Sequence, residues 1–404
     1  MAAVDLTPVE NAIQHLLTLA APPAAVEPVP VHRTLGRVLA RDYTVPADVP
    51  PADNSAVDGY ALRTEDFQSG KPLLISARIP AGQAPEALVT GTAARIFTGS
   101  EIPSGADTVV MQERTRLDAD GVLIDGDVKP DQNIRRRGQD LAAGDLALAQ
   151  GTLIRPQEMG LLASMGIANV EVFEKLKVAI LTTGDELVDP GTPLEAGQIY
   201  NTNRYTLLGL LDQAGCEVVL CESLADTREG TRSTLQRAAK AADLVITSGG
   251  VSVGEEDHVR AVLEEFGQLS LWRMAIKPGK PLAFGGIGGT PVLGLPGNPA
   301  AVLVTFLVVG MPYIRQRQGR LQIHPLGQQV AAGFSVASAS VRREFVRARL
   351  EQDRGTTIIK AFPNQSSGVL SSACWADGLA VVPEHSTLSP GDTITYFPFS
   401  ELVS

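Results

Sequence analysis

The chain begins with a helical pattern of apolar residues. Apolar side chains recur at helix spacing between residues 9 and 17, and residues 7–10 form a capping-box pattern with proline at the first helical position. We therefore expect an amphipathic helix near the N-terminus. Proline-rich segments at residues 21–30 and 45–51 follow it and interrupt regular structure.

Glycine, proline and aspartate turns separate short apolar runs over the next part of the chain. These runs lie at residues 73–79, 94–97, 108–112 and 122–125. Runs of this length, bounded by turn residues, predict a small β-rich domain over residues 51–137. The flanking residues 1–50 and 138–176 are expected to form a linker and helical region, with a helix at residues 157–165.

The pattern then changes to alternating strands and helices. Strand-like runs occur at residues 178–181, 217–220, 244–247 and 292–295, and helical patterns lie between them at residues 203–214, 228–242 and 257–266. This alternation predicts a doubly wound α/β domain with a parallel sheet over residues 177–326. The apolar stretch 300–311 is shorter than the roughly twenty residues needed to cross a bilayer, so we expect a buried core helix.

From about residue 327 the chain returns to β character. Short strands are expected at residues 345–350, 356–362, 378–382 and 392–397. They predict a C-terminal β-barrel or sandwich over residues 327–404. The whole chain is therefore expected to be an α/β multidomain protein.

The composition limits the partners. A formal net charge of −11 at pH 7 argues against a general binder of nucleic acid or anionic membrane, because such proteins carry an excess of Lys and Arg. An anion site must then be a local basic pocket. The cysteines, Cys216, Cys221 and Cys374, lack metal-ligand spacing, and the first ten residues lack a basic secretory region. We expect reduced thiols and a cytoplasmic protein.

Three glycine-rich turns lie close together, at residues 248–254, 277–281 and 294–299. Glycine lets backbone N–H groups approach an anion, and the helix that Asn298 opens would add its dipole. Lys277 and Lys280 add point charges. The turns predict a phosphate pocket, with binding residues Ser248, Gly249, Gly250, Ser252, Gly254, Pro296, Gly297 and Asn298.

Several acids are candidates for holding a metal or a substrate. Asp185 and Glu186 follow the strand at residues 178–181, where a carboxylate binds a metal or a substrate hydroxyl; equally, they fit the first turn of a helix. Asp257 follows the first glycine turn and favours magnesium, which usually takes one or two carboxylates plus phosphate oxygens. Asp226, in a predicted loop, is the weakest candidate.

Residues 135–137 are three consecutive arginines. Such a cluster is by default a solvated run, but the polar and acidic residues up to Asp140 also suit a metal and phosphate site. We find no Ser-His-Asp or Cys-His arrangement, and the five histidines do not pair at metal-ligand spacing. Electrostatic positioning of a phosphorylated ligand is therefore favoured over covalent catalysis.

Further motifs occur in order along the chain together with the glycine turns. They are Ser55-Ala-Val-Asp-Gly-Tyr60, Phe97-Thr-Gly-Ser100 with Pro103-Ser-Gly-Ala-Asp107, and Thr183-Gly-Asp-Glu-Leu187. The set resembles the molybdopterin molybdenumtransferase family, that of MoeA and the gephyrin E-domain, from about residue 8 to the C-terminus. The resemblance implies an elongated homodimer of four-region subunits with a C-terminal β-barrel. It also implies a site between the molybdopterin-binding central domain of one subunit and the β-rich domain of the other.

The resemblance also implies a reaction. The substrates would be adenylylated molybdopterin and molybdate; the adenylyl phosphoanhydride is cleaved, molybdenum enters the dithiolene, and AMP and molybdenum cofactor leave, with help from Mg²⁺. The implied positions around nucleotide, pterin and metal are Asp58, Thr98, Asp140, Glu186, Asp226 and Asp257, with Glu186 and Asp257 toward the metal. The implied anion-binding positions are Lys277, Lys280, Arg342 and Ser371, with Arg343 and Ser372 as near equivalents of the last two.

The chain departs from the family pattern at three places. Val57 replaces a usual methionine, Glu255 and Glu256 replace a common Asp-Tyr pair, and Ala301 stands where many members have serine, which implies one hydroxyl donor fewer for molybdate. Two alternatives stay open: an adenylyltransferase that makes the adenylylated pterin, and a non-catalytic cofactor-binding scaffold. The resemblance is also compatible with transient contacts to molybdopterin-synthesising and molybdoenzyme-maturation proteins.

Overall fold

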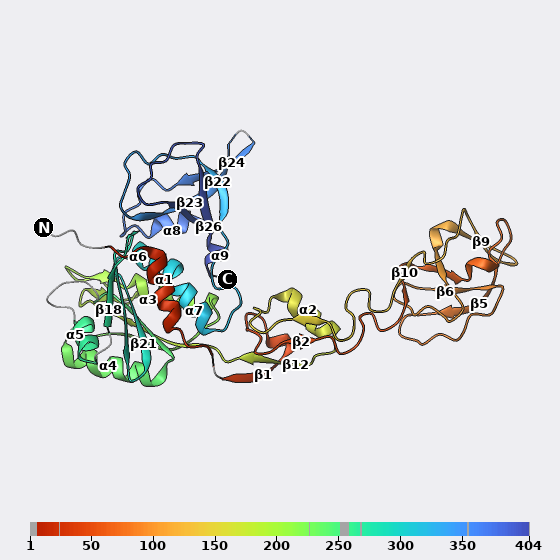
Figure 1. Cartoon of the computed structure of the whole chain (residues 1–404), viewed down its shortest axis with the longest axis horizontal. Coiled ribbons are helices and arrows are strands. Elements are labelled where there is room, and N and C mark those ends of the chain that lie inside the picture. The colour runs from red at the N-terminus through yellow and green to blue at the C-terminus, as the bar shows by residue number, and fades with distance from the viewer. Residues whose placement is uncertain are drawn as a thin grey trace.

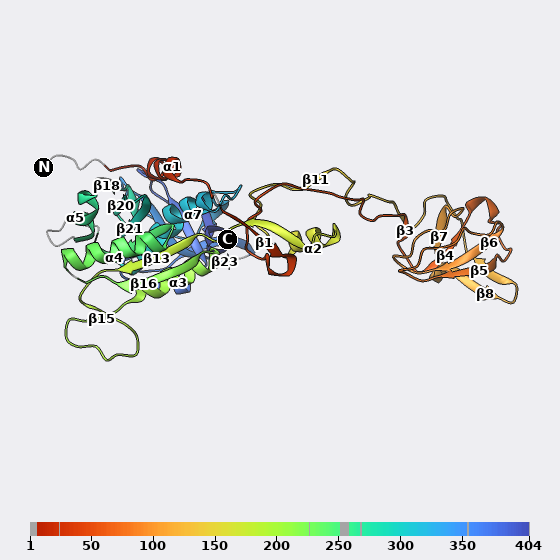
Figure 2. The same cartoon turned by 90° about the horizontal axis from the view of Figure 1, so that it is seen from below.

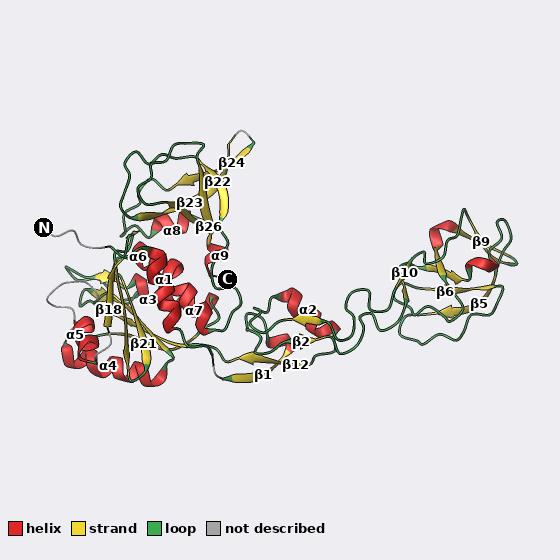
Figure 3. Cartoon of the chain, in the orientation of Figure 1, coloured by secondary structure: helices red, strands yellow, loops and turns green. Residues whose placement is uncertain are grey.

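The computed structural model describes residues 6–23, 25–225, 227–250, 258–266, 269–353 and 355–403. Figure 1 and Figure 2, viewed at right angles, show an elongated chain with a β-rich domain at one end and the α/β domain and C-terminal barrel at the other. A narrow linker region joins them. Figure 3 shows that the long helices gather around the α/β domain, whereas the far end consists mainly of strands and loops.

The α/β domain is built on a six-stranded sheet. The strand order is β16 (Glu217–Ser223), β13 (Lys177–Thr182), β17 (Leu244–Ser248), β21 (Thr290–Leu295), β20 (Pro281–Ile287) and β18 (Leu269–Arg273). The first four strands pair in parallel, as the sequence predicts. The sequence pattern did not reveal β20 and β18, which add two antiparallel pairings, so the sheet is mixed at this edge.

Helices cover both faces of this sheet, which confirms the doubly wound fold. Side chains alternate between two cores: Val178 and Ile180 face one, and Ala179 and Leu181 face the other. Such alternation of apolar residues marks strands that are buried on both sides. The helices of the first core are α1 (Val9–Leu19), α3 (Thr202–Gln213), α6 (Pro299–Thr305) and α7 (Met311–Arg317); those of the second are α4 (Arg228–Ala241) and α5 (His258–Glu265).

The expected core helix at residues 300–311 is longer than the sequence predicts. Helix α6, a π-helical turn η4 (Phe306–Gly310) and α7 form one continuous helix, Pro299–Arg317. It is long and apolar enough to cross a membrane, but 83% of it is buried inside the fold. It therefore acts as a core helix, as expected.

The N-terminal helix belongs to this core as well. Val9, Ala12 and Leu16 of α1 are buried in the same cluster as the sheet and α7. The region that we predicted as linker from residue 1 thus contributes its first helix to the α/β domain. The remaining linker elements are β1 (Val26–Pro30), η1 (Val31–Arg33), β2 (Tyr43–Thr44), β11 (Leu146–Leu148), α2 (Pro156–Ser164) and β12 (Asn169–Phe173).

The C-terminal region is a closed barrel, which decides between the two predicted architectures. Strands β23 (Arg343–Asp353), β24 (Thr356–Ala361), β22 (Gln328–Ala332), β26 (Thr393–Pro398) and β25 (Gly378–Val382) pair in that order, and β25 pairs back to β23. Short helices α8 (Ser371–Trp375) and α9 (Phe399–Val403) flank it. Strand β19 (Ile276–Lys277) pairs with β23, so the second glycine turn is fastened to the barrel.

The β-rich domain has a four-stranded sheet in the order β5 (Leu74–Ile79), β6 (Thr92–Ile96), β4 (Gly59–Leu62) and β7 (Thr108–Met111). Strand β4, which the sequence pattern did not reveal, is fully buried between β6 and β7. The other elements are β3 (Asn54–Ser55), η2 (Thr64–Asp66), η3 (Gln112–Arg114), β8 (Thr115–Asp118), β9 (Gly121–Ile124) and β10 (Ile134–Arg135).

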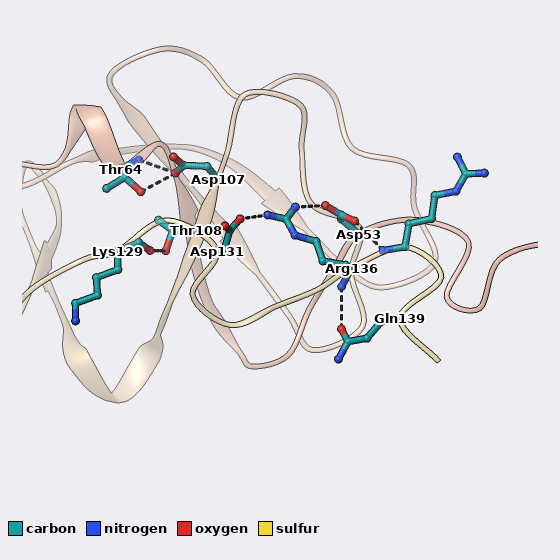
Figure 4. Close-up of polar contacts among 9 residues, drawn as sticks. Asp53, Thr64, Asp107, Thr108, Lys129, Asp131, Arg136 and Gln139 are labelled. Atoms are coloured by element: carbon teal, nitrogen blue, oxygen red, sulfur yellow. Dashed lines mark hydrogen bonds and ion pairs between the residues drawn. The ribbon is translucent and has the colours of Figure 1, made fainter. Parts of the chain in front are cut away.

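Ion pairs brace the junction between this domain and the linker (Figure 4). Arg136 lies between Asp53 and Asp131 and pairs with both, and the Arg137 backbone N–H donates to Asp53 at 2.8 Å. These donors hold the pKa of Asp53 below its ordinary value. Arg137 also pairs with Asp48. Two of the three consecutive arginines are therefore structural, which disfavours a phosphate site there.

Gly59 generates a prediction about this domain. A Cβ at this position would lie 1.9 Å from the Val110 carbonyl oxygen, so Gly59→Ala should separate β4 from β7 and destabilise the domain by about 3 kcal/mol. Hydrogen exchange of peptides that cover β4 and β7 should accelerate. Gly160→Ala is the matched control. A Cβ on Gly160, within α2, would meet no heavy atom within 4 Å apart from its chain neighbours and the backbone of its own helix. Unchanged exchange in Gly59→Ala would contradict this interpretation.

Candidate functional site

A pocket of ≈ 680 Å³ opens at the carboxyl ends of the parallel strands. All three glycine turns contribute to it: Ser248 is the last residue of β17, residues 296–298 follow β21, and residues 278–280, after Lys277 at the end of β19, lead into β20. Ligands of open α/β sheets bind at this edge. The barrel closes another wall with Arg342 and residues 365–367. The pocket is thus shared between two domains of one chain.

A buried asparagine joins two of the turns. Asn203, in the first turn of α3, is 8% exposed, and its Nδ2 donates to Ser248 Oγ at 2.8 Å and to the Gly297 carbonyl at 2.7 Å. Because the carbonyl can only accept, the amide orientation is fixed. Its Oδ1 has no partner among the described residues. Sequence analysis missed Asn203; the available signal was a polar residue on the buried face of a predicted helix.

The glycines in the first turn serve packing more than anion contact. Gly249 and Gly250 have φ of 86° and 66°, and a Cβ at Gly249 would lie 2.6 Å from Thr183 Oγ1. The Gly249 N–H already donates to the Leu295 carbonyl at 3.1 Å. This donor is thus occupied within the sheet, and substrate binding at Gly249 stays a prediction that this N–H does not support.

The start of α6 is also less open than the sequence indicated. Asn298 is its N-cap and lines the pocket, but Pro299 has no N–H and the Ala300 N–H donates to the Ser367 carbonyl at 2.9 Å. This bond ties the helix to the barrel side of the pocket. Ala301, the position of the family departure, lines the pocket and is almost fully buried.

The two lysines differ in their surroundings. Lys277 Nζ pairs with Glu344 at 2.9 Å, whereas Lys280 makes no side-chain hydrogen bond or ion pair with a described residue. Between them Gly279 has a φ of 101°, and a Cβ there would lie 2.3 Å from Thr305 Oγ1. The Pro-Gly spacer therefore packs closely against α6. Of the two lysines, Lys280 is the one whose ammonium group has no ion pair with a described residue.

The near-equivalent anion positions differ in their surroundings: Arg342 from Arg343, and Ser371 from Ser372. Arg342 lines the pocket, whereas Arg343 pairs with Glu10 and Glu384 outside it. Ser371 is exposed at the start of α8 and does not line the pocket, and the buried Ser372 accepts from Arg347 at 3.0 Å. Gln365, Ser366 and Ser367 line the pocket instead, so anion binding by Ser371 stays a prediction without support from this pocket.

The candidate acids also differ in whether they line the pocket. Glu186 lines the pocket, whereas Asp185 is exposed and does not. Asp226, Ser252, Gly254 and Asp257 lie outside the described residues. Within the described part of the chain, no three His, Cys, Asp or Glu side chains group as metal ligands.

Comparison with known proteins places this architecture in one family. Models of the MoeA N-terminal region (domain I and II), a probable molybdopterin binding domain and the MoeA C-terminal region (domain IV) match residues 7–166, 179–316 and 329–399. A molybdopterin molybdenumtransferase of Haemophilus influenzae is 41% identical over 94% of this chain and 96% of its own length. The chain belongs to the MoeA family.

Other relatives agree with this assignment. A molybdopterin molybdenumtransferase 2 of Mycobacterium tuberculosis is 37% identical, covering 88% of this chain and 90% of the relative. The crystal structure of a molybdopterin biosynthesis MoeA protein from Pyrococcus horikoshii aligns with a TM-score of 0.82 and 30% identity, over 98% of this chain and 100% of that one. The MoeA multidomain architecture is therefore confirmed along nearly the whole chain.

The remaining candidates of this MoeA-family chain lie outside the pocket, and two of them, Asp58 and Thr98, are bonded to each other. Asp58 Oδ1 accepts from the Thr98 backbone N–H and hydroxyl, both at 2.8 Å, and these bonds hold the Asp58 pKa below its ordinary value, with Arg95 contributing. Asp140 is exposed, and its N–H donates to the Val49 carbonyl at 3.0 Å. None of the three lines the pocket. Asp58 and Thr98 adjoin β4 and β6, and Figure 1 places β6 at the opposite end of the molecule from α6.

The Asp58 group has cationic and aromatic neighbours that the sequence did not indicate. Phe97 precedes Thr98, and the guanidinium carbons of Arg78 and Arg95 lie 4.7 and 4.8 Å from its ring centroid. Arg95 also donates to the Gly59 carbonyl at 3.0 Å. Pairing of β5 with β6 brings these arginines together, which a linear motif cannot indicate.

The asparagine bridge predicts a stability effect. Asn203→Ala removes both bonds that join Ser248 and Gly297, so the free energy of unfolding should fall by about 1–3 kcal/mol. Urea unfolding followed by circular dichroism measures this change. Gln213→Ala, at an exposed position of the same helix, is the matched control. Equal urea midpoints for the two variants would show that the two Asn203 hydrogen bonds do not contribute to the free energy of unfolding.

Proposed function

We propose that this chain is a molybdopterin molybdenumtransferase, which inserts molybdenum from molybdate into adenylylated molybdopterin and releases AMP. The observation that carries the proposal is the pocket at the carboxyl edge of the sheet, where Lys277, Lys280 and Arg342 converge in a MoeA-family chain. Relatives with this name match the chain over most of their own length. The finished cofactor and AMP would both leave from this pocket.

The cationic side chains fit molybdate as a substrate. Molybdate is a dianion, and Lys and Arg donors form strong charge-assisted hydrogen bonds with oxyanions. Lys280 has no competing carboxylate among the described residues, whereas Lys277 shares its charge with Glu344. Lys280 and Arg342 would therefore bind the dianion, and Lys277 would be held in place by Glu344.

Magnesium would neutralise the phosphoanhydride of the pterin nucleotide. Among the described residues the pocket offers one carboxylate, Glu186, as a ligand. This fits an ion that usually takes one or two carboxylates and completes its shell with substrate phosphates and water. Asp257, outside the described residues, is the second candidate from the sequence.

The separation of the two residue groups supports a homodimer with shared sites. Asp58 and Thr98 adjoin β4 and β6 of the β-rich domain, which lies at the opposite end of the molecule from α6 (Figure 1). Neither they nor Asp140 line the pocket that Lys280 lines, so one subunit would not bring both groups to one substrate in this arrangement. A second copy could place its β-rich domain over the pocket. The Asp58 carboxylate, oriented by Thr98, would then face the substrate from the partner.

No observation favours the adenylyltransferase or the scaffold. The C-terminal region contributes Arg342 and residues 365–367 to the pocket. These residues would therefore take part in a molybdenum-inserting site. We keep the cytoplasm as the proposed location and the molybdopterin-synthesising and molybdoenzyme-maturation proteins as proposed transient partners.

Lys280→Ala tests the anion site. With protein loaded with adenylylated molybdopterin and supplied with Mg²⁺, this variant should need at least about tenfold more molybdate for half-maximal AMP release, because one charge-assisted donor is lost. Lys240→Ala, an exposed lysine on α4 that does not line the pocket, should behave as wild type. Equal molybdate dependence of both variants would remove Lys280 from the site.

Subunit mixing tests the shared site. Asp58→Asn and Lys280→Ala subunits should each be impaired alone. When they are mixed at equal amounts after reversible dissociation, half of the dimers should be heterodimers with one intact site, which restores about a quarter of wild-type AMP release. If each site lies within a single subunit, mixing will restore nothing.

A further inference from the structure

A second cavity, of ≈ 410 Å³, lies where the linker region meets the α/β domain. Three parts of the chain line it: residues 151–153 and Arg155 from the linker, Arg315 of α7 with residues 320–322 and Leu326 beyond it, and Glu401 from α9. Among the described residues, none that lines this cavity also lines the pocket proposed for molybdenum insertion. Its chemistry is therefore independent of that site.

Arg320 is the unusual group in this cavity. Arg320 lines the cavity although the residue is only 8% exposed. One Nη2–H donates to the Ala214 carbonyl at 3.0 Å, and Nε is buried without a partner among the described residues. A guanidinium has five N–H donors, so most of its hydrogen-bonding capacity is unused within the described structure.

The charge of Arg320 is also uncompensated by described residues. Of the other cavity arginines, Arg155 pairs with Glu158, and the charge of Glu401 acts on Arg315. Arg320 forms no ion pair with a described carboxylate, and Arg315 adds a like charge nearby. The Cys216 thiol cannot supply an anion, because burial raises its pKa to about 12.

Arg320 nevertheless keeps its charge at neutral pH. Burial, together with the charge of Arg315, lowers its pKa to about 10, which is still well above neutrality. A buried cation without a counter-charge is costly, and proteins normally pair such groups. A cavity beside the unpaired guanidinium provides room for an anion to do so.

We propose that this cavity binds a tetrahedral oxyanion of the phosphate class, with Arg320 as its principal charge partner. Guanidinium donors suit phosphate geometry. Gln322 also lines the cavity, and its amide, which donates to the His324 carbonyl at 3.5 Å, has a second N–H as a further donor. The ligand is either inorganic phosphate or the terminal phosphate of a small ester. Since the Leu321 N–H already donates to the Gly151 carbonyl at 3.0 Å, an anion here would further fasten the linker to the α/β domain.

Equilibrium dialysis of the full-length protein with inorganic phosphate, at constant ionic strength, tests the proposal. We expect a saturable site that persists in Lys280→Ala, and at least about tenfold weaker binding to this site in Arg320→Gln, which loses the charge-assisted donors. Arg237→Gln, an arginine on α4 paired with Glu222, is the matched control and should bind as wild type. Competition by AMP would identify an ester as the ligand, and competition by sulfate alone would identify a free oxyanion.

Gln322→Glu provides a second variant that does not depend on removing a buried arginine. Gln322 is exposed, so the substitution should preserve the fold while placing a carboxylate on the cavity wall. This carboxylate would repel a phosphate or pair with Arg320 itself, and either effect should abolish saturable binding. The proposal is overturned if wild type shows no saturable binding, if Gln322→Glu retains full affinity, or if Lys280→Ala removes the binding.

Discussion

Burial of the central sheet on both faces is the constraint on which the rest of the structure depends. Helices α1, α3, α6 and α7 cover one face, and α4 and α5 cover the other. Polar ligands are thereby kept from the faces, and the carboxyl edge of the parallel strands remains as the place where loops diverge. The glycine turns, Asn203 and Glu186 all occur at this edge. The position of the pocket is therefore a consequence of how the sheet is covered.

Tight packing then gives the pocket its shape. Gly249 and Gly279 adopt positive φ, and side chains there would meet Thr183 or Thr305. Asn203 holds the ends of two strands through one amide group. The Ala300 N–H, bonded to Ser367, fastens the barrel to the same edge. The polar groups left over for a ligand are mainly side chains, Lys280 and Arg342 above all, rather than the backbone donors that glycine turns suggest.

The elongated shape has a different physical origin. The β-rich domain has its own small core, around Tyr60, Leu62 and Val110. Two chain segments connect it to the linker region, and ion pairs of Arg136 and Arg137 stabilise this junction. Asp58 and Thr98 adjoin β4 and β6, and Figure 1 shows β6 at the opposite end of the molecule from α6. A site that used both residue groups would need a second copy of the chain, and this separation is the basis of the homodimer proposed above.

The sequence by itself determined the order of the regions, the four parallel strands, most of the helices and the family. Apolar periodicity and turn residues encode these features locally. It missed β4 and β20, whose residues include motif or glycine positions, and β18, whose five residues are too short a run to stand out. Only the tertiary structure decided that Arg342 rather than Arg343 faces the pocket, that Ser371 does not, and that Asn203 and Arg320 are buried with unused polar atoms. Those outcomes depend on which distant side chains satisfy each polar group, and that pairing is set by packing across elements rather than by spacing along the chain.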